Sequence, residues 1–329
     1  MGIKNLNKFL TRFAPNSSTI KKYNDYSNKT IAIDTSLVIY KYIAAMRNTG
    51  KDLTNKDGNV TSHLHGLLFL INTLLSNKIT PIFVFDGKPP DIKKATLQKR
   101  QDIRKKATNK LENVELSELT MKQKISLFMQ STKISDEICN DAKLFLKTLG
   151  IPYIDSIEEA DAQMVCLLQN NLVHAVATED MDLLTFGADR LLKNFFSLKE
   201  NNIIEIDREK MLKELKINGD QFIDVSILLG CDYLPTVEGI GLVKTYDYIT
   251  KYKSLEGIFE KVEKPDPYNF VEVRDYFKNA MQKCTIPSAD TIKVLKTNTD
   301  DIYKLLVTKF EFNLGKYNSF IVSRNKFFV

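Results

Sequence analysis

The feature of this chain that most restricts its fold is a repeated pattern in which a short apolar run ends on an acid. TIAID ends at Asp34, PIFVFD at Asp86, IPYID at Asp155 and HAVATED at Asp180. Apolar runs of this length, rich in branched residues and followed by turn-forming residues, are typical of buried β-strands. We therefore expect a strand at each position, with a carboxylate at or just beyond its end.

Helical patterns lie between these strands, in segments 36–46, 62–75 and 136–149. Buried strands that alternate with helices predict an α/β fold, with a mainly parallel, twisted central sheet and helices on both faces. In such sheets ligands bind beyond the carboxyl ends of the strands. The acids would then lie along the edge where chemistry takes place.

Composition narrows the class of protein. With 43% hydrophobic and 27% charged residues, the chain matches a globular protein and not a disordered one. No apolar run approaches the roughly 20 residues that cross a bilayer, and the N-terminus lacks the apolar core of a signal peptide. The four cysteines are far apart and only three histidines are present, so we expect reduced thiols, an intracellular protein and no structural zinc.

Positive charge is concentrated in one segment. The net charge is +6, and the stretch from Lys93 to Lys110 holds eight basic residues against one acid, Asp102. One interpretation is a solvated helix face. The other is a helix that binds phosphate groups.

Carboxylates also gather at turns. Beside Asp34 and Asp86 stand the cluster Glu158-Glu159-Ala160-Asp161, the pair Asp180 and Asp182, and Asp232 within GCDYL. Hard oxygen ligands without histidine or cysteine favour Mg²⁺ or Mn²⁺. So many acids at one place require more than one divalent ion. Two ions about 4 Å apart are the usual arrangement for phosphodiester hydrolysis.

Several of these acids have a structural alternative. Ser156 and Glu159 have the spacing of a capping box, which would satisfy the amides of a helix N-terminus. Asp155 is left out of the site because it fits a simple turn acid. On an extended backbone Glu179 would point away, whereas Asp180 and Asp182 would face the same way, as a metal pair requires.

A glycine pair stands before a further helical pattern. An apolar helix is expected to end at Gly230, and Gly239-Ile240-Gly241 then leads into the next helix. Backbone N–H groups in such a turn can hold a phosphate oxygen. A plain helix–helix turn would have the same spacing.

Six blocks follow one another along the chain: MGIKNLNKFL, IAIDTSLVIYKYI, FVFDGKPPDIKKATLQKR, EEADAQ, ATEDMDLLTFGADRLLKN and QFIDVSILLGCDYLPTVEGIGLVK. In this order they resemble one family, the structure-specific flap endonucleases of the XPG superfamily. The resemblance covers roughly residues 1–260 and implies a metal-dependent 5′ nuclease of DNA replication, repair or recombination. Such an enzyme cuts single-stranded flaps close to their junction with duplex DNA.

The resemblance also implies roles for individual residues. The implied ligands of two Mg²⁺ ions, which Mn²⁺ can replace, are Asp34, Asp86, Glu159, Asp161, Asp180, Asp182 and Asp232. Lys93 and Arg100 match the cations that reach the scissile phosphate. The implied DNA-binding residues are Gly2, Tyr40, Arg47, Arg104, Gly239, Gly241 and Lys244. Among these, Tyr40 would stack on a terminal base, and Gly2 would pack near the active site. The family commonly has Glu where this chain has Asp161, so its metal contact would run through water.

The implied organisation has four parts. A nuclease region spans 1–107, a helical arch or cap 108–134, and a second nuclease region 135–260. The last contains a helix–two-turn–helix at about 221–250, which grips duplex DNA and often holds K⁺. A C-terminal helical region spans 261–329.

Partners follow from the same resemblance. Branched or flapped DNA is the expected substrate, and we expect a monomer with no membrane contact. The segment NSFIVSRNKFFV lacks the glutamine of a sliding-clamp peptide, so clamp binding is not expected. A cellular protein would be nuclear, whereas a viral member would work in the host cytoplasm or at replication sites.

Three other functions share parts of this sequence pattern. A 5′→3′ exonuclease or junction-cutting relative would share the active site. A non-catalytic DNA-binding protein of the same fold would lack some acids, and none is missing. A phosphatase with an Asp nucleophile needs a second acid that Phe85-Asp86-Gly87-Lys88 does not have.

Overall fold

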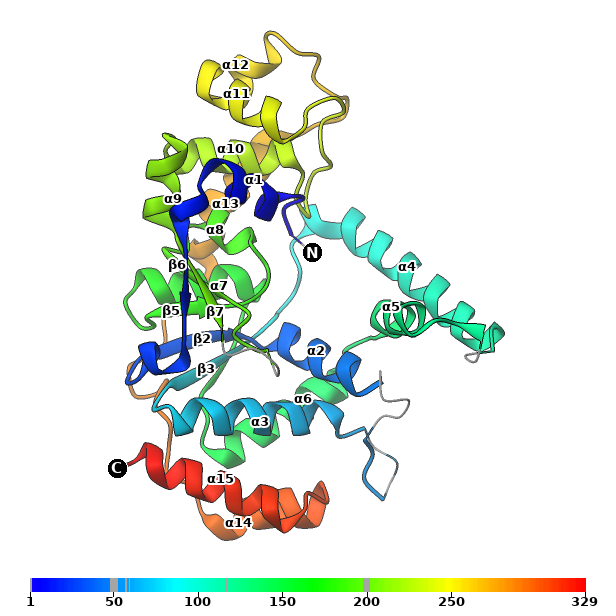
Figure 1. Cartoon of the computed structure of the whole chain (residues 1–329), viewed down its shortest axis with the longest axis vertical. Coiled ribbons are helices and arrows are strands. Elements are labelled where there is room, and N and C mark those ends of the chain that lie inside the picture. The colour runs from blue at the N-terminus through cyan, green and yellow to red at the C-terminus, as the bar shows by residue number, and fades with distance from the viewer. Residues whose placement is uncertain (1, 48–52, 57, 59, 116–117, 198–201) are drawn as a thin grey trace. The chain divides into compact units, whose positions relative to one another are not determined.

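The computed structural model describes residues 2–47, 53–56, 58, 60–115, 118–197 and 202–329. The chain divides into two compact units. The first comprises Met1–Lys22, Asp86–Thr96 and Ser156–Ile286, and the second Tyr23–Phe85, Leu97–Asp155 and Pro287–Val329. Each unit therefore combines segments that are far apart in the sequence, as the colours of Figure 1 show.

The second unit contains the parallel strands that the acid-terminated runs predicted. They are β2 (Thr30–Asp34), β3 (Thr80–Phe85) and β4 (Tyr153–Asp155), in the order β2-β3-β4. Asp34 lies opposite Val84, and Phe85 lies opposite Asp155. The carboxyl ends of the three strands therefore share one edge. Their apolar residues are almost fully buried in β2 and β3, which explains why those runs are continuous.

The second unit also contains helices, three of which pack against these strands. Those with the predicted patterns are α2 (Thr35–Arg47), α3 (Ser62–Ser76) and α6 (Asp136–Leu149). The others are α4 (Lys94–Asn113), which starts in the first unit, α5 (Met121–Ser131), α14 (Thr299–Tyr303) and α15 (Leu314–Phe327). In Figure 1 α15 runs beside α3. Ser135 caps α6, and Gly150 ends it in the left-handed conformation at φ 75°.

The first unit contains a mixed group of strands in the order β1-β7-β6-β5. They are β1 (Ser18–Lys21), β5 (Ala175–Ala177), β6 (Arg190–Lys193) and β7 (Ile203–Asp207). Strands β5 and β6 are parallel, whereas β7 is antiparallel to both β6 and β1. The sequence patterns predicted β5 but none of the other three. The mainly parallel α/β fold is confirmed, with an antiparallel edge that short, partly exposed strands did not reveal.

The helices of the first unit complete the fold. They are α1 (Leu6–Phe13), α7 (Ala160–Gln169), α8 (Asp182–Phe186), α9 (Arg208–Leu215), α10 (Gly219–Leu229), α11 (Leu242–Tyr252), α12 (Leu255–Phe259) and α13 (Phe270–Asn279). Short 3₁₀ turns occur at Pro15–Ser17, Tyr23–Tyr26, Asp91–Lys93 and Ala280–Lys283, and a π-helical turn at Lys304–Lys309. No helix in the described ranges is long and apolar enough to cross a membrane.

Candidate active site

The side chains of Asp180 and Asp182 meet beside the N-terminal segment. Asp182 starts α8, and its Oδ1 accepts the N–H of Ile3 at 2.7 Å. The N–H of Asp182 in turn bonds Oδ1 of Asp180 at 3.1 Å. A Cβ atom on Gly2, whose φ is 76°, would collide with Oδ1 of both acids. The two side chains converge as the sequence predicted, although a turn, and not an extended backbone, brings them together.

Glu159 is held by three donors. Its carboxylate is buried and forms an ion pair with Lys93 through Oε1. Its Oε2 accepts the hydroxyl groups of Tyr233 at 2.6 Å and Tyr276 at 3.1 Å. Glu159 itself occupies the N-cap position of α7, and Ser156 Oγ has no hydrogen-bond partner among the described residues. The capping-box interpretation of Ser156 and Glu159 is therefore wrong, because the glutamate side chain faces a lysine and two phenols.

Asp86 lies at the start of the same helix. Its Oδ1 accepts the N–H of Ala160, the first residue of α7, at 2.9 Å. The next residue, Gly87, leaves no room for a side chain, because a Cβ there would collide with the carbonyl group of Ser156. This close backbone contact places Asp86 next to the turn that carries Glu159.

Lys93 connects the carboxylates of this region. Its Nζ lies 3.2 Å from Oδ2 of Asp232 and pairs with Glu159 at the same time. Burial alone would lower the pKa of Lys93, but the carboxylates of Glu159, Asp232 and Asp161 outweigh it and raise that pKa. Lys93 is therefore a protonated ammonium group at neutral pH.

Six carboxylates of the first unit form what we call the carboxylate cluster: Asp86, Glu159, Asp161, Asp180, Asp182 and Asp232. Only 2% of Asp182 is exposed, and burial together with the charges of Asp180 and Asp232 raises its pKa. Lys93 supplies positive charge to Glu159 and Asp232. The like charges of Asp180 and Asp232 around Asp182 are of the kind that a bound cation would offset.

The donor chemistry of the cluster fits hard divalent cations. All six side chains offer carboxylate oxygens, which Mg²⁺ and Mn²⁺ prefer. Among the described residues, no three His, Cys, Asp or Glu side chains are gathered closely enough to hold a metal ion as they stand. Instead the ammonium group of Lys93 lies between Glu159 and Asp232. A bound cation would compete with this lysine for Oε1 of Glu159.

The seventh predicted ligand, Asp34, belongs to the second unit. Its Oδ1 accepts the N–H of Leu37 at 2.9 Å and so caps the first turn of α2. Asp155, which the sequence reading left out of the site, pairs with Lys143 at 2.7 Å. Both strand-end acids of this unit thus have a local structural partner.

The predicted DNA-binding residues of the second unit lie on α2 and α4. The hydroxyl group of Tyr40 donates to the carbonyl oxygen of Met129 in α5. Burial raises the pKa of Tyr40, and the nearby charge of Arg104 partly opposes this shift. Arg100 and Arg104 are both half-buried on α4. Arg47 ends α2, and its side chain lies outside the described part of the structure.

The basic segment, Lys93 to Lys110, begins at the end of a 3₁₀ turn and covers most of α4. Ala107 is the buried residue of that helix, so nearly all of α4 faces solvent. This agrees with the solvated-face interpretation of the segment, and phosphate binding by its lysines stays a prediction.

The predicted glycine turn precedes α11 in the first unit. Gly239 has a φ of 75°, and Gly241 occupies the N-cap position of α11. No atom lies within 4 Å of the place where either residue would carry a Cβ. The Nζ of Lys244 donates to the carbonyl oxygen of Gly239 at 2.9 Å. The turn is thus open around both glycines, with a lysine folded back on it.

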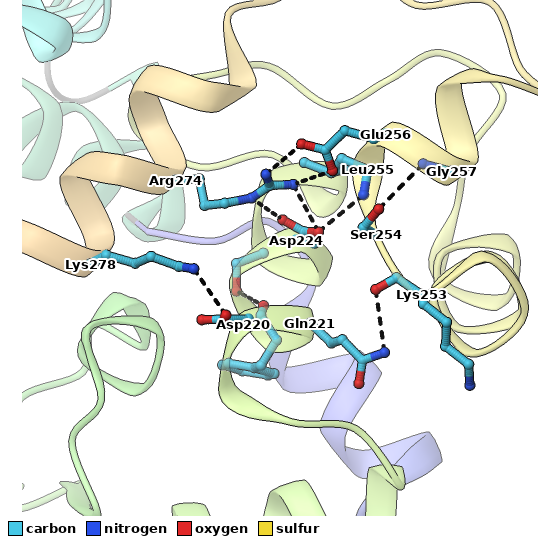
Figure 2. A network of polar contacts seen from close by, with 12 residues as sticks. Asp220, Gln221, Asp224, Lys253, Ser254, Leu255, Glu256, Gly257, Arg274 and Lys278 are labelled. Carbon is cyan, nitrogen blue, oxygen red and sulfur yellow. Dashed lines mark hydrogen bonds and ion pairs between the residues drawn. The ribbon is translucent and has the colours of Figure 1, made fainter.

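A second acidic group in the first unit is fully paired. Asp224 of α10 accepts two hydrogen bonds from Arg274 of α13, at 2.8 and 3.0 Å, and one from the N–H of Leu255 at 3.0 Å. Arg274 also pairs with Glu256 at 2.6 Å, and Figure 2 shows the guanidinium group between the two carboxylates. We call Asp224, Arg274 and Glu256 the arginine network. It ties α10, α12 and α13 together.

Sequence reasoning missed the two tyrosines that bond Glu159. Tyr233 follows Asp232 in GCDYL, and this position next to a predicted ligand was a usable signal. Tyr276 lies in an ordinary amphipathic helix, α13, with no local signal. Only the packing of α13 brings it to Glu159.

The fold and the carboxylate cluster together define a class: an α/β protein with a partly buried group of acids near its strand ends. The XPG N-terminal domain family matches residues 1–107, and the XPG I-region family matches residues 150–232. All six acids of the cluster lie within these two ranges.

Individual relatives extend the match over the chain. Flap endonuclease 1 of Naegleria gruberi is 34% identical over 98% of this chain and 84% of its own length. Flap endonuclease 1-A of Sorghum bicolor is 40% identical over 87% of this chain and 77% of its own length. The solved structure of flap endonuclease-1 from Methanococcus jannaschii has a TM-score of 0.71 at 29% identity, covering 94% of this chain and 95% of its own. This chain belongs to the flap endonuclease family of the XPG superfamily.

Proposed function

We propose that this protein is a structure-specific 5′ flap endonuclease that hydrolyses a phosphodiester near the single-strand/double-strand junction of branched DNA. The observation that carries the proposal is the carboxylate cluster, in which Glu159, Asp182 and Asp232 are buried, in a chain of this family. Buried carboxylates that lie close together are costly in a folded protein unless a cationic ligand or a reaction uses them.

Two Mg²⁺ ions would be held by the carboxylate cluster and by Asp34, with Mn²⁺ able to replace them. When bound, the ions would supply Lewis-acid chemistry, which favours ionisation of a water molecule and stabilises charge on the departing oxygen. The ligand set agrees with this proposal, because every member offers hard oxygen donors.

The protein's own cations would act on the phosphate group. Lys93 is protonated, buried and already beside the acids, so its ammonium group can neutralise phosphate oxygens as their charge increases. Arg100 lies on α4, about two helical turns after Lys93, and would contact the same DNA backbone. In the reaction one P–O bond forms to water and one P–O bond to the sugar oxygen breaks.

Binding would depend on shape and on phosphates, not on base edges. Tyr40 would stack on a terminal base, while Arg47 and Arg104 would contact phosphates. The Gly239–Lys244 turn would hold a strand of the duplex, with K⁺ beside it. We further propose a monomer that works in DNA replication and repair, with residues 108–134 as an arch, 1–107 and 135–260 as nuclease regions, and no sliding-clamp binding.

The test uses untagged protein, because Gly2 packs against Asp180 and Asp182 and an N-terminal tag would add residues beside this contact. A 5′-labelled double-flap DNA is incubated with Mg²⁺, beside the same DNA with a bulky block on its 5′ end. Asp180→Asn, which keeps the side-chain volume, is the matched inactive control.

We expect cleavage near the junction for wild type, with loss of cleavage in the variant and on the blocked DNA. Release of mononucleotides from nicked duplexes, with flaps left intact, would favour the exonuclease alternative. Binding without cleavage in either Mg²⁺ or Mn²⁺ would contradict the catalytic role of the acids.

A further inference from the structure

We propose that Tyr276 is a positioning residue for the carboxylate cluster: its hydroxyl group orients Glu159 so that Oε1 faces Lys93 or a divalent cation. The inference rests on the proposed function, because it assigns Glu159 as a cation ligand. Tyr276 lies outside residues 1–107 and 150–232, which the two XPG families match. A helix beyond those ranges would therefore complete the site.

The two carboxylate oxygens of Glu159 have different partners. Oε2 accepts a hydrogen bond from each of two phenol hydroxyl groups, that of Tyr233 at 2.6 Å and that of Tyr276 at 3.1 Å. Oε1 pairs with Lys93. The last torsion of a glutamate side chain is broad and roughly two-fold, so a carboxylate without such donors samples many orientations. Two donors on one oxygen restrict that torsion and direct the other oxygen.

Helix α13 is held firmly enough to deliver this hydroxyl group. Figure 2 shows Arg274 and Lys278 on the side of α13 that faces α10, where they pair with Asp224 and Asp220. Residues two positions apart on a helix point in nearly opposite directions. Tyr276 therefore projects away from the arginine network.

The ring of Tyr276 is also packed on its own side. It meets the ring of Tyr233 at 5.0 Å and that of Phe186 at 5.8 Å, both edge-on. Anchoring on one face and ring packing on the other leave the hydroxyl group with one direction, toward Glu159. A phenylalanine would keep these ring contacts and lose only the hydrogen bond.

The experiment compares Tyr276→Phe with wild type by calorimetric titration of Mn²⁺ into the full-length, DNA-free protein. Loss of a partner that orients a metal ligand typically weakens metal affinity by about 10-fold or more. We expect about a 10-fold loss for Tyr276→Phe, because Tyr233 still donates to the same oxygen. Tyr268→Phe is the matched control. It also removes a buried hydroxyl bond, to the carbonyl oxygen of Ile227 at 3.0 Å, but leaves Glu159 untouched.

A second readout separates positioning from a general structural effect. In single-turnover cleavage of flap DNA, Tyr276→Phe should need about 10-fold more Mg²⁺ for half-maximal rate and reach the wild-type rate at saturation. In a Glu159→Gln background the same change should have no further effect, because the two residues act as one unit. DNA affinity measured in Ca²⁺ should be unchanged.

Unchanged Mn²⁺ affinity in Tyr276→Phe, or a loss as large in Tyr268→Phe, would overturn the inference. So would an effect that persists in the Glu159→Gln background. If Tyr276→Phe does not fold, the titration is repeated with Tyr276→Leu, which lacks the hydroxyl group and the ring contacts, and for which we expect at least the same weakening. If wild type binds Mn²⁺ but cleaves no flap, the proposed function fails while the titration still decides the role of Tyr276.

Discussion

The carboxylate cluster and the arginine network are both acidic, both partly buried and both in the first unit, yet their charges are balanced differently. In the arginine network one guanidinium group lies between two carboxylates and bonds both. In the carboxylate cluster the ammonium group of Lys93 pairs with Glu159 and Asp232, whereas Asp180 and Asp182 converge beside Gly2 and repel each other. The first arrangement brings opposite charges together, and the second also brings like charges together.

The pKa shifts of the two groups follow this balance. Burial and the neighbouring carboxylates raise the pKa of Asp182. Hydrogen bonds from Arg274 lower the pKa of Glu256 to about 2. Burial raises the pKa of Asp224 as well, although the hydrogen bonds and charge of Arg274 oppose that shift. The two groups therefore differ in what surrounds the buried acid: a guanidinium group beside Asp224, and further carboxylates beside Asp182.

The most severe test of this comparison is Asp182→Asn. We expect DNA cleavage to fall by at least about 1,000-fold, because a ligand of the charge-stabilising cations is lost. The metal-free variant should nevertheless unfold at a higher temperature than wild type at pH 7, because a buried, repelled charge is removed. Asparagine retains an acceptor for the N–H of Ile3.

The stability of wild type should depend on pH in the way that a destabilising Asp182 carboxylate predicts. The folded-state pKa of Asp182 is above its unfolded value of about 3.9. Its stability contribution is therefore full below that value and is lost as pH rises toward the folded pKa. Thermal unfolding in EDTA across this range measures it. If Asp182→Asn is less stable than wild type at pH 7, the assignment of Asp182 as a destabilising acid is contradicted.

Arg274→Met removes the cation of the arginine network. It leaves Asp224 buried without its cation, and removing one partner of such a pair costs about 3–5 kcal/mol of unfolding free energy. Urea unfolding at pH 7 provides the measurement. The double variant Asp224→Asn/Arg274→Met should lose less than the single one, because no unpaired charge remains. Equal losses would mean that the pairing itself contributes little.

Gly2→Ala tests the close approach in the carboxylate cluster. Its Cβ would collide with Asp180 and Asp182, and the left-handed φ adds about 1–2 kcal/mol of backbone strain. We expect flap cleavage to slow by about 10-fold, which corresponds to about 1.4 kcal/mol. Gly58→Ala is the matched control, since Gly58 has a φ of 82° and open space around it. A similar slowing in both variants would point to strain alone.

Glu256→Gln should have the smallest effect. Half of the Glu256 side chain is exposed, so its pair with Arg274 contributes less than about 1 kcal/mol to stability at pH 7. Because the folded-state pKa is lowered to about 2, the contribution is present above the ordinary value of about 4.3 and is lost as pH falls toward 2. Thermal unfolding from pH 7 to pH 3 follows this loss, which has the opposite sign to that of Asp182. A variant that matches wild type throughout would show that solvent screens the pair completely.

Local patterns were sufficient for a large part of the fold. The acid-terminated runs located β2, β3, β4 and β5, and apolar periodicity located α2, α3, α6 and α10. These patterns work because a buried strand or a half-buried helix must show its burial in residues that are close in sequence. Strands β1, β6 and β7 escaped because they are short and partly exposed, and because partners chosen elsewhere in the chain fix their antiparallel pairing.

The sequence indicated which residue types the candidate site contains, but not which of those residues contact one another. The residues by themselves identified the acids, the basic segment and the glycine turn, because oxygen ligands, cations and tight turns require particular residue types. They did not show that Glu159 bonds Tyr276 instead of capping α7, or that Asp86 bonds the first N–H of that helix. Those contacts join residues 117 and 74 positions apart in the sequence. They exist only after the chain has closed, so packing in three dimensions decided them, while local sequence had already decided which side chains would be available.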